Sequence, residues 1–107
     1  MITKILKEKE GEVLISLEGR LDSLNAPKFN DAVHPLIGQE GMRMIIDCEK
    51  LIYICSAGLR SFVQLLKDTT THNGSIALRG VNSEVRKVLD MTGLSWLFNE
   101  SADETQP

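Results

Sequence analysis

The sequence has no long hydrophobic run, no cluster of basic residues and only two cysteines among its 107 residues. Its apolar runs are far shorter than the ~20 residues of a membrane helix, and its N-terminus does not have the pattern of a signal peptide. The net charge is −3, whereas nucleic-acid phosphates are bound by basic patches. We therefore expect a cytoplasmic protein that binds no nucleic acid and does not insert into a membrane.

The cysteines and histidines give no sign of a disulfide or a metal site. Cys48 and Cys55 both lie beside apolar sequence, and two thiols without a secretory signal fit a reducing compartment. Cys55 is either a reactive thiol at a helix start or a small buried hydrophobic residue, and we favour the second. His34 and His72 are far from each other and from the cysteines, so they do not have metal-ligand spacing.

The sequence also contains no G-x-S-x-G elbow and no Gly-rich nucleotide loop. A hydrolase built on a serine needs a base and an orienting acid. For Ser56, the base would have to be His34, and nothing in the sequence brings the two together. We expect no enzyme activity, no catalytic residue and no cofactor.

The hydrophobic share of 42% and the length of 107 residues fit one domain with its own core. Residues 1–9 alternate weakly and residues 11–18 alternate well, with Gly11 at a tight turn, so they predict an antiparallel hairpin. Leu14 breaks the alternation and indicates that both faces of this strand are partly buried.

Helical and strand patterns then alternate along the rest of the chain. Pro27 suits the first turn of a helix, whereas Pro35 should end that helix irregularly. The apolar run in the strand at 43–48 fits a strand covered on both faces. The predicted elements are a helix at 26–34 with an irregular turn to 37, a strand at 43–48, a helix that begins at 56 and fades over 69–72, a strand at 75–78, a helix that is capped by Ser83 and ended by Gly93, a candidate short strand at 94–98 and a disordered polar tail at 100–107.

This order, β-β-α-β-α-β-α with a candidate last strand, predicts an α/β fold. Crossover helices imply a mixed, mostly parallel sheet packed with helices, antiparallel only at the first hairpin. Sites in such sheets gather at the carboxyl ends of the strands. We expect three loops to share that edge, at residues 21–25, 50–58 and 80–83.

Ser56 lies in the middle loop of the three, at the start of a predicted helix. A serine there can cap the helix, and its hydroxyl lies where unpaired backbone N–H groups attract anions. A plain cap is the alternative to a functional role. The helix itself is predicted from residues at i, i+3, i+4 and i+7 spacing, with Ser61, Gln64 and Lys67 outside the buried face, which is formed by Leu59, Phe62, Val63 and Leu66.

Three segments, taken together, carry a family resemblance. They are the segment 19–26 before the first helix, the segment 82–94 of the third helix, and the run 51–54 followed by Ser56-Ala57-Gly58-Leu59-Arg60. In this order and at these lengths they resemble the STAS domain family, which is named for sulfate transporters and anti-sigma factor antagonists. The resemblance implies one STAS domain over residues 1–99.

The resemblance to free-standing bacterial members implies a partner switch. The unmodified antagonist binds an anti-sigma factor, which is also a serine kinase, and so frees the sigma factor. The kinase phosphorylates the serine that matches Ser56, binding is lost, and a PP2C-type phosphatase restores the unmodified form. This chain has Cys55 where the family often has an acidic residue. The alternative is a STAS-like docking subunit of a transporter or lipid-trafficking complex.

The same resemblance implies a partner-binding surface around Ser56. Asp22 and Asn25 either contact the partner or only form a turn and a cap, and Arg60 either contacts it or stays solvated. The predicted contact residues are Asp22, Ser23, Asn25, Cys55, Ala57, Gly58, Leu59, Arg60 and Asn82.

Overall fold

The computed structural model describes residues 2–9, 11–94 and 99–100. None of the described helices combines the length and hydrophobicity needed to cross a membrane. The elements, in chain order, are β1 (Ile2–Lys9), β2 (Glu12–Leu21), α1 (Ala26–Val33), the 3-10 turn η1 (His34–Leu36), β3 (Arg43–Ile54), α2 (Ser56–Thr71), β4 (Ser75–Arg79), α3 (Ser83–Met91) and β5 (Asn99–Glu100).

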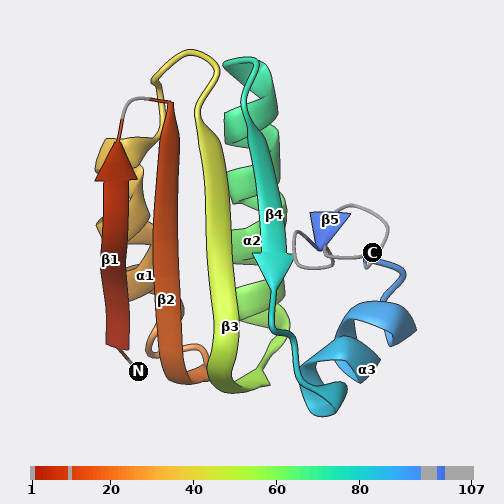
Figure 1. The fold of residues 1–107 in the computed structure, drawn as a ribbon. Helices are drawn as coiled ribbons and strands as arrows, with labels where there is room; N and C mark the ends of the chain where they lie inside the picture. The colour runs from red at the N-terminus through yellow and green to blue at the C-terminus, as the bar shows by residue number, and fades with distance from the viewer. Residues whose placement is uncertain (1, 10, 95–98, 101–107) are drawn as a thin grey trace.

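The strands form one sheet in the order β1-β2-β3-β4-β5. β1 and β2 pair antiparallel, and all other neighbours pair parallel, which confirms the predicted mixed sheet and its hairpin. Figure 1 shows α1 and α2 behind the sheet, and α3 beyond the lower end of β4. The carboxyl ends of β2, β3 and β4 therefore point to one edge, where α2 and α3 begin.

The first helix confirms the effect predicted for its two prolines. α1 begins at Ala26 with Pro27 in its first turn and ends at Val33. The chain then tightens into η1, which contains Pro35, because proline cannot supply the N–H that an α-helix needs at that position.

The core lies between the sheet and the two helices behind it. Alternate residues of β2 point into it, and Phe29 of α1 meets Phe62 of α2 edge-on, with ring centroids 5.8 Å apart. Edge-to-face contact is a favoured geometry of buried aromatic rings. The largest fully buried side chains are Phe29, Phe62, Ile15, Leu17, Leu21, Met44, Ile46, Leu51, Leu78, Val13, Val85 and Cys48.

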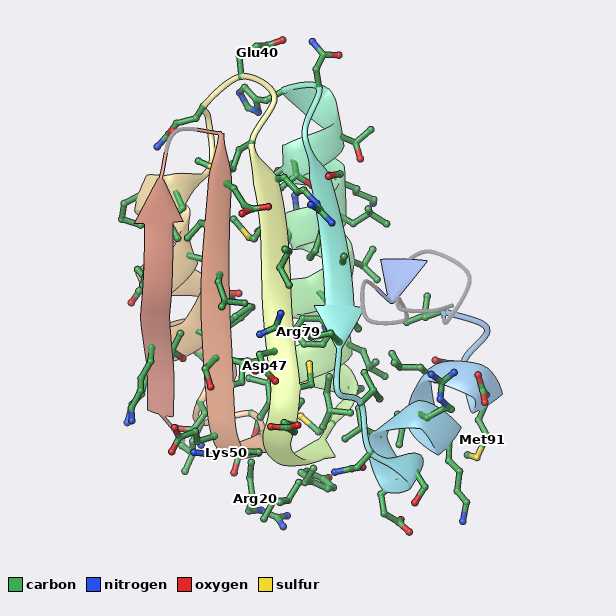
Figure 2. The ribbon with its side chains drawn as sticks, in the orientation of Figure 1. Arg20, Glu40, Asp47, Lys50, Arg79 and Met91 are labelled. Atoms are coloured by element: carbon green, nitrogen blue, oxygen red, sulfur yellow. The ribbon has the colours of Figure 1, made fainter. Side chains whose placement is uncertain are left out.

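The centre of the strand predicted at 43–48 is buried on both faces, as expected, since Met44, Ile45 and Ile46 are all buried. In the described part of the chain, α1 and α2 lie on one face only. Ile45, on the face without helices, is nevertheless buried, with only 9% of its surface exposed. Ion pairs lie across the strands on either side of it. Arg43 pairs with Glu12 at 3.2 Å, and Arg79 pairs with Asp47 at 3.5 Å, the two residues labelled in Figure 2. The aliphatic stems of such long side chains shield apolar neighbours.

β3 is longer than the sequence pattern indicates. It runs from Arg43 to Ile54, so the predicted loop at 50–58 is wrong and only Cys55 separates strand from helix. β2 likewise continues to Leu21. The two strands stay paired because the register shifts twice, between Ser16 and Glu18 and between Gly19 and Arg20, and such bulges let a twisted strand continue.

The buried face of α2 is also wider than predicted. Ser61 and Leu65 are buried, whereas Val63 and Leu66 are only partly buried. The sequence predicts Ser61 outside the buried face. Because α2 packs on α1 as well as on the sheet, Ser61 is buried as well. The Ser61 hydroxyl donates a hydrogen bond to the Ala57 carbonyl at 3.2 Å, which satisfies a buried polar group within the helix.

The C-terminal predictions are tested only in part. Residues 95–98, most of the predicted last strand, and residues 101–107 of the predicted tail lie outside the described residues. The described β5 pairs with β4 through Asn99 beside Ala77 and Glu100 beside Leu78. Glu100, the first residue of the predicted tail, therefore lies in a strand.

Replacing Phe62 with alanine should lower the free energy of unfolding by about 3–5 kcal/mol, because the cavity between α1, α2 and the sheet cannot fully collapse. Denaturant titration measures the change. Gln64→Ala, on the exposed side of the same helix, is the control and should change stability by less than about 0.5 kcal/mol. Equal stabilities of the two variants would contradict the described packing of α2.

Candidate functional site

The candidate site lies where β2 and β3 end and α2 begins. The backbone N–H of Cys55 donates to the Leu21 carbonyl at 3.1 Å, so the end of β2 is joined to the residue before Ser56. On the other side, the Asn82 side chain before α3 donates to the Leu51 carbonyl of β3 at 2.7 Å. The predicted convergence of three segments on one edge is thus confirmed.

Ser56 is the first residue of α2, not its cap. The N-cap is Cys55, whose extended backbone has φ −105° and ψ −179°, and no side-chain hydrogen bond caps the helix. The helix thus begins at Ser56 as predicted, whereas the alternative role of Ser56 as a helix cap is not observed, because Cys55 holds the N-cap position. Ser56 is exposed, and no described residue forms a hydrogen bond with its hydroxyl.

Gly58 and Leu59 have a packing role at this site. Both are buried, and a Cβ on Gly58 would lie 2.8 Å from Leu21 Cγ and 2.9 Å from Ile54 Cγ1. The sequence placed them on a partner-binding surface, but burial leaves them little area for a partner. Gly58 instead lets the first turn of α2 press directly onto the ends of β2 and β3.

The turn after β2 is held by Asp22. Its Oδ1 accepts hydrogen bonds from the backbone N–H groups of Leu24 at 3.2 Å and Asn25 at 3.0 Å. Asn25 is the N-cap residue of α1, yet its side chain does not cap the helix. Its Nδ2 donates instead to the Arg20 carbonyl at 3.0 Å. Asp22 and Asn25 thus have the turn role that the sequence left open.

Asn82 holds the third segment of the site. Its Oδ1 accepts from the Val85 N–H at 2.8 Å, which caps α3, while its Nδ2 binds the end of β3. The predicted cap Ser83 is the first helical residue, so that assignment is wrong by one position. Asn82 fits because an amide carries an acceptor and a donor together, whereas a serine hydroxyl reaches less far.

A shallow hollow runs beside Ser56 between α1 and α2. Its volume is about 380 Å³. It brings the predicted contact residues Ser23, Ala57 and Arg60 to one surface, although Ser23 is far from the others in sequence. The residues that line it are Ser23, Ala26, Pro27, Asn30, Ala57, Arg60, Ser61 and Gln64.

Three apolar side chains around this edge are exposed, which the sequence pattern does not predict. Leu24, Ile52 and Tyr53 are 79%, 60% and 39% exposed, respectively. The guanidinium of Arg20 lies 4.1 Å from the centroid of the Tyr53 ring. The one available signal was Leu24 itself, a large apolar residue inside a polar turn. Ile52 and Tyr53 lie in the segment 50–58, which was predicted to be a loop.

The site has the chemistry of a modifiable surface. In the described part of the chain, no histidine or carboxylate hydrogen-bonds to Ser56, so its hydroxyl has no partner that would activate it as a nucleophile. The described residues also include no group of three metal-binding side chains. An exposed serine at a helix start is accessible to an enzyme that adds a group to it.

Comparison with known proteins gives a consistent result. The family described as STAS domain matches residues 3–105. The chain is 27% identical over 97 residues to the anti-sigma-B factor antagonist of Bacillus subtilis (strain 168), which covers 91% of this chain and 88% of the relative. It is 29% identical over 91 residues to the anti-sigma-B factor antagonist of Listeria monocytogenes serovar 1/2a, covering 84% and 80%.

The fold is shared with solved structures. The Bacillus cell fate determinant SpoIIAA in its phosphorylated form superposes with a TM-score of 0.73 at 19% identity, covering 98% of this chain and all of that chain (100%). This likeness confirms the α/β sheet and helix arrangement.

Gly58→Ala should destabilise the domain by about 1–3 kcal/mol, because the added methyl group clashes with Leu21 and Ile54. The direction of the stability change is informative, since helix propensity alone would favour alanine by about 1 kcal/mol. The control is the same substitution in a Leu21→Ala background, where the methyl group has space and should cost less. Stabilisation by Gly58→Ala in the native background would contradict the close packing.

Asn82→Ala should cost about 1–2 kcal/mol through loss of the α3 cap. Asn82→Asp keeps the acceptor for Val85 but removes the donor to Leu51, so it should retain part of that stability. Chemical denaturation of the three proteins gives the order. An aspartate variant less stable than the alanine variant would show that the cap is not the main contribution.

Proposed function

The chain belongs to the STAS domain family, and from this we propose that it is an anti-sigma factor antagonist whose switch is Ser56. Two relatives that align with this chain over 88% and 80% of their own length are named for that activity. The observation that carries the proposal is the exposed Ser56 hydroxyl at the first residue of α2, next to the ends of β2 and β3. It offers a phosphate acceptor beside the segments that precede α1 and α3.

In the proposed cycle, the unmodified chain binds an anti-sigma factor that is also a serine kinase, and so frees the sigma factor. The kinase transfers the γ-phosphoryl group of ATP to Ser56 Oγ, whose proton leaves to a base of the kinase, and ADP is released. The modified chain dissociates. A PP2C-type phosphatase hydrolyses the phosphate ester and regenerates the hydroxyl. Cys48 and Cys55 are not joined in a disulfide, which suits a reducing cytoplasm.

The domain itself tolerates the phosphate. The group adds about −1.5 to −2 charge at neutral pH, and it does so at the positive end of a 16-residue helix with no acidic residue in its first turn. The helix dipole and the free N–H groups of that turn favour an anion there. SpoIIAA, which shares this fold, has itself been solved with its phosphate. Modification should therefore leave the fold intact.

The partner is affected instead. A protein surface that packs against an uncharged hydroxyl would have to bury a phosphate without its water, and this cost opposes binding.

The proposed contact residues differ in exposure. Ser23 and Arg60 are exposed, whereas the polar Asp22, Asn25 and Asn82 are half-buried. Cys55 and Ala57 are also half-buried. Gly58 and Leu59 support these contacts from below.

The docking-subunit alternative uses the same loop for a different partner. Nothing in the site of this chain favours it over the antagonist, and the named relatives support the antagonist. Co-purification separates the two: an ATP-binding anti-sigma factor supports the proposal, and a transport ATPase subunit supports the alternative.

Ser56→Ala should fold normally, accept no phosphate from the cognate anti-sigma kinase and bind it persistently in the presence of ATP. Ser56→Asp should also fold, but should bind at least about ten-fold more weakly, because a carboxylate places charge at the same point. Titration calorimetry with nucleotide present gives both affinities, and mass spectrometry locates the phosphate.

Ser61→Ala is the matched control for the acceptor position. Ser61 lies in the same helix but is 6% exposed and bonded to the Ala57 carbonyl, so the variant should still be phosphorylated. A phosphate found on Ser61, or equal affinities of the Ser56→Ala and Ser56→Asp variants, would overturn the assignment of Ser56.

A further inference from the structure

The edge that carries Ser56 exposes apolar area that the phosphate switch does not use. Large apolar side chains cost free energy when they face water, and a cluster of them marks an interaction surface. Leu24 is 79% exposed in the turn after β2, and Tyr53 is 39% exposed two residues before Cys55. Both lie in segments that end at the Ser56 edge.

Leu24 is held outward by a rigid turn. Two backbone N–H groups, those of Leu24 and Asn25, donate to the single Asp22 Oδ1. The side chain therefore projects from a hydrogen-bonded turn, not from a loose loop. A turn whose backbone is already fixed loses little backbone conformational entropy on binding, so the apolar side chain that it presents contributes more to affinity.

Arg20 connects this turn to Tyr53. Its carbonyl accepts from Asn25 Nδ2 at 3.0 Å, and its guanidinium lies 4.1 Å from the Tyr53 ring centroid. Arg20 and Tyr53 are also paired with each other in the β2–β3 register. Figure 2 shows Arg20 at the lower end of the sheet, near Lys50. Leu24, Arg20 and Tyr53 are thus one preorganised unit, which we call the anchor.

The charges around the anchor indicate what it binds. On the sheet face, Arg43 and Arg79 each have a carboxylate partner, Glu12 and Asp47. In the described part of the chain, no carboxylate lies within ion-pair distance of Arg20, which is exposed. Arg60, one helical turn beyond Ser56, is also exposed and has no described carboxylate within ion-pair distance. A partner with carboxylates at these points would complement them.

We propose that the anchor is the site by which the anti-sigma factor holds this chain over Ser56. The inference rests on the proposed function and names the recognition chemistry: an apolar pocket of the anti-sigma factor takes Leu24, and acidic groups at its rim face Arg20 and Arg60. The anchor adjoins the phosphorylation site through the Cys55 N–H to Leu21 carbonyl bond of 3.1 Å. A protein that covers Ser56 therefore covers the anchor as well.

In this arrangement, affinity and control come from two different parts of one surface. The anchor supplies affinity through buried apolar area, and an aromatic–arginine pair is typical of the residues that dominate interfaces. Ser56 supplies control, because a phosphate on Ser56 would meet the same acidic rim that Arg20 and Arg60 attract. Like-charge contact then adds to the cost of burying the phosphate.

Leu24→Ser tests the anchor against Met91→Ser. Met91 is 81% exposed but lies at the far end of α3, away from Arg20 (Figure 2). Calorimetric titration of the unphosphorylated variants with the cognate ATP-binding anti-sigma factor should give a Kd raised about ten-fold or more for Leu24→Ser and less than about two-fold for Met91→Ser. Arg20→Gln should also weaken binding and should reduce its salt dependence. Thermal melts of all three should match the native protein.

The outcomes separate this inference from the proposed function. Leu24→Ser and Arg20→Gln proteins that bind like the native chain, while Ser56→Asp binds poorly, overturn the anchor and leave the switch in place. A native chain that binds no anti-sigma factor overturns both. Equal losses for Leu24→Ser and Met91→Ser also overturn the anchor, because the loss would then reflect general surface polarity. Loss confined to Leu24→Ser and Arg20→Gln supports it.

Discussion

The close approach of α2 to the sheet at Gly58 is the contact on which the site depends. With no side chain at that position, the first turn of the helix rests on Leu21 and Ile54. A bulkier residue would lift the helix start away from the ends of β2 and β3. Ser56 would then move out of the surface formed by the turn after β2 and the segment before α3. The position of the serine is therefore set by packing beneath it.

Sequence patterns predicted the architecture because its signals are local. Pro35 marked the irregular end of α1, and alternation in β2 marked the hairpin, since each depends on a few neighbouring residues. The length of β3 was missed for the opposite reason. Whether residues 51–54 are loop or strand depends on β2, whose two register shifts keep it paired that far. Bulges of this kind have no clear single-residue signature.

The site was predicted in outline but not in its roles. Ser56 and Asn82 were placed at the right edge because parallel strands align their carboxyl ends. The cap of α3 was misassigned by one position, since Asn82 precedes Ser83, and the capping role left open for Ser56 is not observed, since Cys55 is the N-cap residue of α2. The burial of Gly58 and the exposure of Leu24 could not be read from composition, because both depend on which surface the neighbouring elements leave open.

The single-residue junction at Cys55 has a consequence for the time course of signalling. Strand and helix meet with no flexible loop between them, so the region around Ser56 has little freedom to adopt a second shape. In the proposed switch, information is then stored as a covalent label on a fixed surface and not as a conformation. Such a label does not decay by thermal relaxation of the domain. Under this proposal, the duration of a signal is set by the lifetime of one phosphate ester, and its strength by the ratio of the rates that make and hydrolyse that ester.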